Sequence, residues 1–152
     1  MSTSQGSVLA ANAEHNRADV TQDSASLIGR ILLSAIFILS GVSKLAAPAM
    51  MVGYISSVGL PLPQVALVVA IIVEVGGGLA LIAGYRTRLV AAGLALFSVV
   101  TALAFHNALG DQNQFIHFFK NLAMAGGLLQ VAKAVYEGAL AGSEAAKALR
   151  KG

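Results

Sequence analysis

A single carboxylate inside a long apolar run is the residue most suggestive of chemistry in this sequence. The run "IIVEVGGGLALIAGYRTR" extends from Ile71 to Arg88, and Glu74 has only Ile, Val and Gly around it. Because a charge is expensive to place in an apolar medium, such a residue needs a cation, a proton or a functional role. We interpret Glu74 as a functional carboxylate, with a structural ion pair that fixes helix packing as the alternative.

Candidate partners for Glu74 lie on other apolar runs. In "HFFKNLAMAGGLL", the side chains of His117, Lys120 and Asn121 share one helical face, because residues three or four apart are neighbours. Counted from the ends of the runs at 1.5 Å per residue, Glu74 lies about 15 Å deep and Lys120 about 8 Å deep. This comparison predicts a Glu74–Lys120 ion pair, with Lys44 as the partner if the ends of the runs are shifted.

Other chemistries have weaker support. The chain has no Cys, which excludes disulfides, thiolate catalysis, iron–sulfur clusters and thioether-linked haem. His106 and His117 are the two candidates for a non-covalent haem or a metal site, but no supporting ligand spacing accompanies them, and we predict no metal site. The glycines at 76–78 lack the third glycine of a dinucleotide-binding loop and are predicted to serve helix packing.

The elements that carry these residues are predicted to be four transmembrane helices. Of the 152 residues, 57% are hydrophobic and 11% are charged, which is too few charges to coat a soluble globule. Apolar runs cover residues 27–47, 64–84, 89–106 and 115–136, and each is long enough to cross about 30 Å of hydrocarbon. The predicted fold class is therefore an all-α integral membrane protein, a four-transmembrane-helix bundle.

The basic residues predict the orientation of this bundle. Lys44 and Lys120 lie within apolar runs, whereas the other eight of the ten Lys and Arg residues fall on one side. Arg86 and Arg88 fill the tight connection on that side, which the positive-inside rule assigns to the cytoplasm. We therefore predict cytoplasmic tails at residues 1–26 and 138–152 around a membrane domain at residues 27–137. Ser143 is a candidate cap for a short helix in the second tail, but such a helix is too short to be stable alone, and we predict a solvated tail. Scattered basic residues without a stripe argue against nucleic-acid binding.

Three segments resemble the DoxX family of small bacterial membrane proteins. They are "RILLSAIFILSGVSKL" (Arg30–Leu45), "EVGGGLALIAGYRTR" (Glu74–Arg88) and "HFFKNLAMAGGLL" (His117–Leu129), and the resemblance extends over residues 27–136. It implies a four-helix bundle in the bacterial inner membrane, and some relatives belong to quinone-reducing or redox-stress complexes. The family's recurrent polar residues match the following positions: Lys44, Glu74, Arg88, Lys120 and Asn121. The absence of Cys excludes any thiol-dependent form of that chemistry here.

Three functions follow from this pattern. The first is a quinone-linked redox protein or subunit, in which an apolar slot binds the quinone and nearby groups move protons. The expected catalytic residues are Glu74, Lys120 and His117, and the expected quinone contacts are Lys44, His106 and Asn121. The second is a non-catalytic anchor or assembly subunit of a redox complex, and the third is a small proton-coupled transporter, which would need oligomerisation. The lipid bilayer is an expected partner in all three cases, and the first two functions also require a soluble or membrane-bound redox partner. Whether the chain is itself an enzyme stays open.

Overall fold

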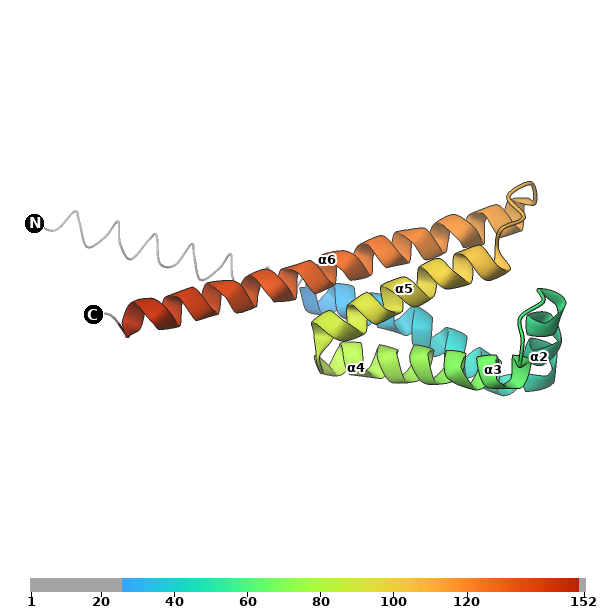
Figure 1. Cartoon of the computed structure of the whole chain (residues 1–152), viewed down its shortest axis with the longest axis horizontal. Coiled ribbons are helices and arrows are strands. Elements are labelled where there is room, and N and C mark those ends of the chain that lie inside the picture. The colour runs from blue at the N-terminus through green and yellow to red at the C-terminus, as the bar shows by residue number, and fades with distance from the viewer. Residues whose placement is uncertain (1–25, 151–152) are drawn as a thin grey trace, which may run out of the picture.

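The computed structural model describes residues 26–150, which are helical and contain no strand (Figure 1). The expected N-terminal tail at residues 1–26 lies almost wholly outside this range, as do residues 151 and 152. The second apolar run is one continuous helix whose middle turn, η1, is a π-helix. The elements are the first helix (Ser26–Ala46), α2 (Pro48–Ser57), α3 (Pro63–Ile71), η1 (Ile72–Gly76), α4 (Gly77–Ala83), α5 (Thr87–Phe105) and α6 (Gln112–Leu149).

Three helices are long and apolar enough to cross a membrane. They are Ser26–Ala46, Pro63–Ala83 and Thr87–Phe105, which confirms three of the predicted runs to within a few residues. The fourth predicted run lies inside α6, but α6 is not among these three helices. Instead, α6 packs along α5, so the two form an antiparallel pair (Figure 1).

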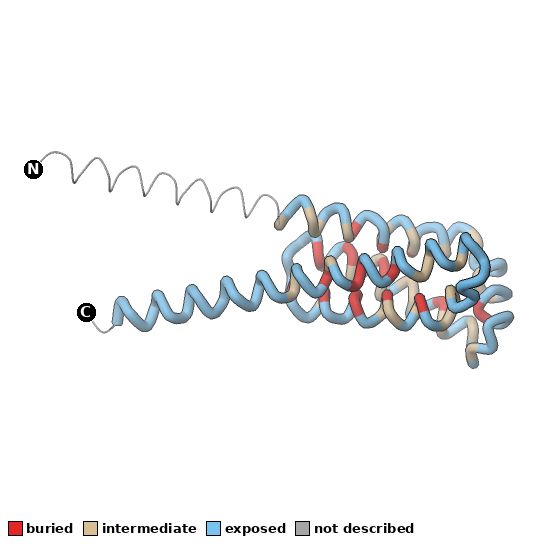
Figure 2. The backbone as a smooth tube through the Cα atoms, turned by 90° about the horizontal axis from the view of Figure 1, so that it is seen from above, coloured by how far each residue is buried: buried red, intermediate tan, exposed pale blue. Residues whose placement is uncertain are grey.

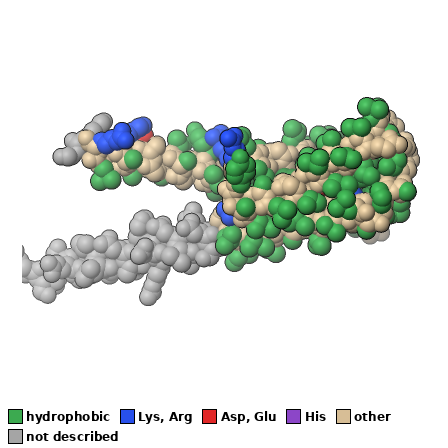
Figure 3. Space-filling view, turned by 90° about the horizontal axis from the view of Figure 1, so that it is seen from below, with side chains coloured by type: hydrophobic (Ala, Val, Ile, Leu, Met, Phe, Trp, Pro, Cys, Tyr) green, Lys and Arg blue, Asp and Glu red, His purple; other side chains and the backbone are tan. Residues whose placement is uncertain are grey.

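The outside of the bundle is apolar, and the buried residues form a narrow seam between the helices (Figure 2). Leu32, Leu39 and Leu96 are each about two-thirds exposed, at 65%, 68% and 66%. Apolar side chains cover the bundle in Figure 3, whereas Lys and Arg gather where α6 leaves the bundle and farther along α6. Exposed leucines of this kind are expected when lipid rather than water surrounds the helices.

Glycines bring the second helix close to its neighbours. A Cβ at Gly41 would lie 2.5 Å from Val75 Cγ2, and a Cβ at Gly78 would lie 3.2 Å from the Ser34 carbonyl oxygen. Gly77 makes a similar approach to Leu94 of α5. The predicted packing role is therefore confirmed for Gly77 and Gly78, since small residues let helix backbones approach. It is wrong for Gly76, which is exposed with open space around it.

Two segments differ from the prediction. The segment after Pro48, for which no helix was predicted, begins with helix α2, because proline at the first helical position is favourable. No separate helix capped by Ser143 exists, because α6 runs unbroken to Leu149 and Ser143 Oγ donates to the Leu140 carbonyl within it. The residues after Tyr136 are thus an exposed helical extension of α6.

The turn between α4 and α5 is stabilised by hydrogen bonds within its own segment. Gly84 has a φ of +73°, and the amides of Gly84 and Tyr85 donate to the carbonyls of Leu81 and Ala80. This is the Schellman pattern, in which a left-handed glycine ends a helix. It fixes a tight turn at the end of the bundle opposite α2 (Figure 1).

Candidate functional site

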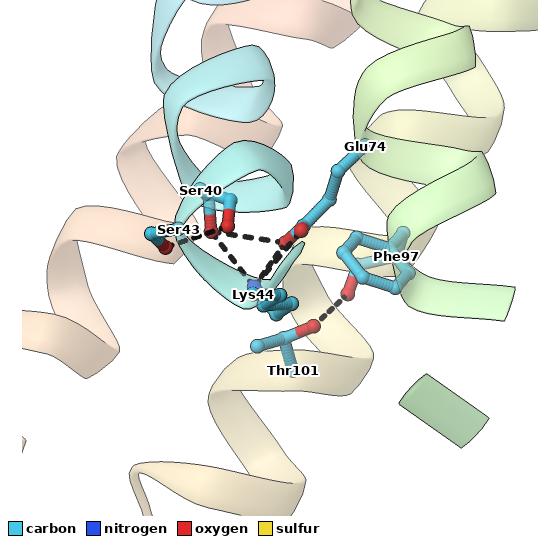
Figure 4. A network of polar contacts seen from close by, with 6 residues as sticks. All are labelled: Ser40, Ser43, Lys44, Glu74, Phe97 and Thr101. Carbon is cyan, nitrogen blue, oxygen red and sulfur yellow. Dashed lines mark hydrogen bonds and ion pairs between the residues drawn. The ribbon is translucent and has the colours of Figure 1, made fainter. Parts of the chain in front are cut away.

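The carboxylate of Glu74 forms a buried ion pair with Lys44. Lys44 Nζ lies 2.9 Å from Glu74 Oε1 and 2.8 Å from Oε2, and the Glu74 side chain is only 6% exposed. Ser40 Oγ accepts a hydrogen bond from Lys44 Nζ and donates one to Glu74 Oε1, so the three side chains close a triangle (Figure 4). Glu74 Oε2 accepts no hydrogen bond from residues 26–150 in addition to its ionic contact with Lys44. One buried acceptor position at this carboxylate is therefore unused.

The predicted Glu74–Lys120 pair is wrong, and the alternative partner Lys44 is the right one. The close approaches of Gly41 to η1 and of Ser34 to Gly78 set an antiparallel register between the first helix and the second. In this register Lys44 lies about one turn from Glu74, a span that a lysine stem can cover. The depth comparison assumed that the ends of the apolar runs lie at the same level. In the structure, α3 begins beyond the end of the first helix, so Glu74 lies level with the last turns of that helix.

The unusual turn at Glu74 contributes to this position. Glu74 is the central residue of η1, and the Gly77 amide contacts the carbonyls of both Glu74 and Val73. A π-turn inserts one extra residue into a helix, and such turns are frequent at functional sites. The sequence signal was the isolated carboxylate beside glycines, but the π-turn itself was not predicted.

Lys120 belongs to a second polar group. Its Nζ lies 2.8 Å from His117 Nδ1, one turn earlier on α6. The His117 ring stacks on the His106 ring with 5.1 Å between centroids, and His106 Nδ1 lies 2.8 Å from Gln114 Oε1. Each Nδ1 thus has a side-chain partner, and the two imidazoles form a stacked pair beside Lys120.

Asn121 is buried but satisfied within its own helix. Its Nδ2 donates to the His117 carbonyl at 3.0 Å. The residue is 7% exposed and lines the same cavity as the other polar groups. Asn121 makes no hydrogen bond to another helix among the described residues.

All six predicted site residues line one cavity of about 720 Å³. Most of its wall is apolar and comes from the first helix, α2, α3, α5 and α6. Three further polar side chains line the cavity and were not predicted, namely Ser40, Tyr54 and Thr101. Ser40 precedes Lys44 by one helical turn and could have been found by that spacing, whereas Tyr54 lies on α2, a helix that was not predicted. The site residues that line the cavity are Lys44, Glu74, His106, His117, Lys120 and Asn121.

Helix α2 covers one side of this cavity. Met51, Tyr54 and Ile55 face it, and the Tyr54 hydroxyl donates to the Phe105 carbonyl at the end of α5. The Tyr54 and Phe105 rings also contact each other, with centroids 5.5 Å apart. These contacts hold α2 over the end of the bundle, since the last carbonyls of α5 have no partner within their helix.

Arg86 and Arg88 lie away from the cavity, at the turn between α4 and α5. Arg86 has a φ of +41° as the residue before α5, and the Arg88 guanidinium lies 4.4 Å from the centre of the Tyr136 ring. Arg30 reaches the same turn, where its Nη2 donates to the Ile82 carbonyl at 3.4 Å. Basic residues from the first helix and α5 thus meet at one end of the bundle, opposite α2.

The comparison with known proteins settles the family. The DoxX family profile matches residues 25–107, more than half of the chain. This chain belongs to the DoxX family. It is a DoxX-family integral membrane protein, and the resemblance seen in the sequence is confirmed.

Two Escherichia coli K12 proteins are similar to this DoxX chain over most of their length. Inner membrane protein YqjF is 36% identical over 111 residues, which cover 73% of this chain and 84% of YqjF. Inner membrane protein YphA is 32% identical over 111 residues, covering 70% of this chain and 79% of YphA. No solved structure matches. The profile match includes Lys44 and Glu74 but ends before α6, so Lys120 and His117 lie outside it.

Proposed function

We propose that this DoxX protein is a quinone-binding membrane subunit of a redox complex. The observation that carries the proposal is the 720 Å³ cavity, whose mostly apolar wall includes nine polar or ionisable side chains. A quinone needs such a site, because its ring and tail are apolar while its two carbonyl oxygens require hydrogen-bond donors. The buried Glu74–Lys44 pair and the Lys120–His117 pair supply donors from two sides.

The expected chemistry is the gain of two electrons and two protons by a quinone to give a quinol. The electrons come from a soluble or membrane-bound donor protein, and the chain's own residues bind the ring and deliver protons. Glu74 and His117 are proton-transfer groups, and Lys120 stabilises the negative charge that develops on a carbonyl oxygen. Lys44 orients Glu74, while His106 and Asn121 complete the wall.

A binding measurement tests this function. The purified protein in lipid nanodiscs is titrated with a short-chain benzoquinone, and quenching of tyrosine emission is followed, which is simple because the chain has no Trp. We expect saturable quenching in the wild type and in Glu137→Gln, and weakened binding in Glu74→Gln. Glu137 is the matched control, since its carboxylate also pairs with a lysine but is 61% exposed. Quenching that is no greater than partition into empty nanodiscs would exclude the quinone function.

We also propose that α6 is the fourth membrane span and that both termini are cytoplasmic. Residues 115–136 of α6 lie along α5, so a membrane that surrounds α5 also surrounds this part of α6. Arg30, Arg86 and Arg88 gather at the end from which the α6 extension leaves, which favours a cytoplasmic position for that end. The inner membrane is the proposed location, by analogy with the two E. coli relatives.

An anchor or assembly role is the second candidate. It is favoured by the α6 extension, which is exposed throughout residues 137–149 and carries the Lys147–Glu144 pair on its surface. An exposed helix beyond the bundle offers a docking point for a soluble enzyme. Copurification of a soluble oxidoreductase that is lost when residues 138–152 are deleted, with no bound quinone, would favour this candidate over the first.

A further inference from the structure

The charges in the cavity do not balance. Among the described residues that line it, the formally charged side chains are Lys44, Glu74 and Lys120, and the two imidazoles of His106 and His117 accompany them. Lys44 and Glu74 neutralise each other at 2.8 Å. Lys120 remains, so the cavity has one positive charge in excess.

Lys120 has a neutral partner where a charged one would be expected. Its Nζ contacts His117 Nδ1 at 2.8 Å, and no carboxylate of residues 26–150 lies within ion-pair distance of it. Lys120 is an exposed residue of α6, but its exposed neighbours Ile116 and Phe119 are apolar, and an ammonium group in such surroundings is stabilised mainly by an opposite charge. The ammonium also has three donors, of which one hydrogen bond to a ring nitrogen uses a single proton. Lys120 is therefore able to bind an anion that the described protein does not supply.

We propose that the cavity binds an acidic, lipid-soluble ligand whose negatively charged oxygen contacts Lys120. The ligand class is an amphiphile with an ionised enol or carboxylate on an apolar body, and the proposal rests on the proposed function only in using the same cavity. The apolar wall, which includes Ile36, Leu39, Val69 and Val100, accommodates the body of the ligand. The stacked rings of His106 and His117 provide a flat, polar surface next to the charged oxygen.

This binding mode predicts selectivity for charge over shape. A hydroxynaphthoquinone, which is ionised at neutral pH, and its methyl ether have almost the same ring but differ by one negative charge. A charge-assisted hydrogen bond in an apolar site is stronger than a neutral one, so the acid should bind about tenfold more tightly than the ether. Replacing Lys120 by Met keeps an unbranched side chain that is only one atom shorter and removes the charge, and this preference should then disappear.

The test titrates both naphthoquinones into wild-type protein in nanodiscs of neutral phosphatidylcholine, with empty nanodiscs correcting for partition. The variants are Lys120→Met, Lys120→Arg and the control Lys133→Met, which removes an exposed lysine from the same helix. We expect the tenfold preference in the wild type, in Lys133→Met and, reduced, in Lys120→Arg. Equal binding of acid and ether by the wild type overturns the proposal even if the variants do not fold, as does a preference that persists in Lys120→Met.

A second pair of probes separates this inference from the quinone function. Dodecanoate and its methyl ester differ in the same way but contain no quinone. Selective, Lys120-dependent binding of dodecanoate without binding of either naphthoquinone would support the acidic-ligand inference and exclude the quinone function. Binding of both naphthoquinones with equal affinity would support the quinone function and exclude the acidic-ligand inference. Binding of none of the four probes would overturn both proposals.

Discussion

At the scale of single residues, the ion pair of Glu74 and Lys44 is more buried than the other ion pairs among residues 26–150. The Lys44 side chain is 19% exposed and that of Glu74 is 6% exposed, so neither charge can reach much solvent. Ser40 is bonded to both, which keeps the three polar groups together in an apolar surrounding. Removing one charge therefore leaves the other without compensation.

We predict that Glu74→Gln destabilises the folded bundle. Breaking a buried ion pair costs about 3–5 kcal/mol in soluble proteins, with smaller values expected in membranes. The double variant Glu74→Gln with Lys44→Met should recover much of this loss, because no lone ammonium remains. Thermal unfolding in mild detergent measures the change, with Glu137→Gln as the exposed control, for which about 0–1 kcal/mol is expected. A Glu74→Gln protein as stable as the wild type would show that the pair does not hold the bundle together.

At the scale of elements, the close contact between the first helix and the second depends on glycine. A Cβ at Gly41 would meet Val75 Cγ2 at 2.5 Å and Glu74 Cβ at 3.3 Å, next to the ion pair. The valine side chain would have to move, and it belongs to the π-turn that carries Glu74. The register between these helices, and so the choice of Lys44 as partner, depends on this contact.

We predict that Gly41→Ala weakens the bundle while Gly29→Ala does not. Both glycines lie on the first helix, but a Cβ at Gly29 has nothing within 4 Å. Overpacking a tight contact costs about 1–3 kcal/mol, whereas alanine at an open helical position is tolerated or favourable. Unfolding of the two variants in detergent gives the comparison. Equal stability would mean that the helices separate slightly at no cost, and the register would then have another cause.

At the scale of the whole molecule, the orientation in the membrane can be tested directly. Because the chain has no Cys, single cysteines introduced at Ser56, Gln112 and Ser143 are the only reactive thiols. All three positions are exposed, the first two at the α2 end and the third on the α6 extension. An impermeant maleimide added to intact cells should label Ser56→Cys and Gln112→Cys but not Ser143→Cys. Labelling only at Ser143→Cys would reverse the orientation, and labelling at Ser56→Cys but not Gln112→Cys would place α6 differently.

The sequence alone determined the helical class, the spans within residues 26–105 and the family. These properties depend on local quantities, namely the length of apolar runs, the proline and glycine positions and the distribution of Lys and Arg. It also showed that Glu74 needed a partner. Its neighbours in the sequence are apolar, so its carboxylate was expected in an apolar surrounding, where a charge must be compensated. The six candidate residues were chosen by helical spacing and do line one cavity.

Only the tertiary structure decided which lysine pairs with Glu74 and what shape the cavity has. Lys44 and Lys120 are both basic residues on apolar helices, and the choice between them depends on a register set by Gly41, Gly78 and the π-turn. Helix α2 covers the cavity with Tyr54 and begins at Pro48. In the sequence, this proline is equally compatible with the end of the preceding helix and with the start of a new one. A register and a cavity arise from contacts between residues far apart in the chain, so the pattern within any one segment does not contain them.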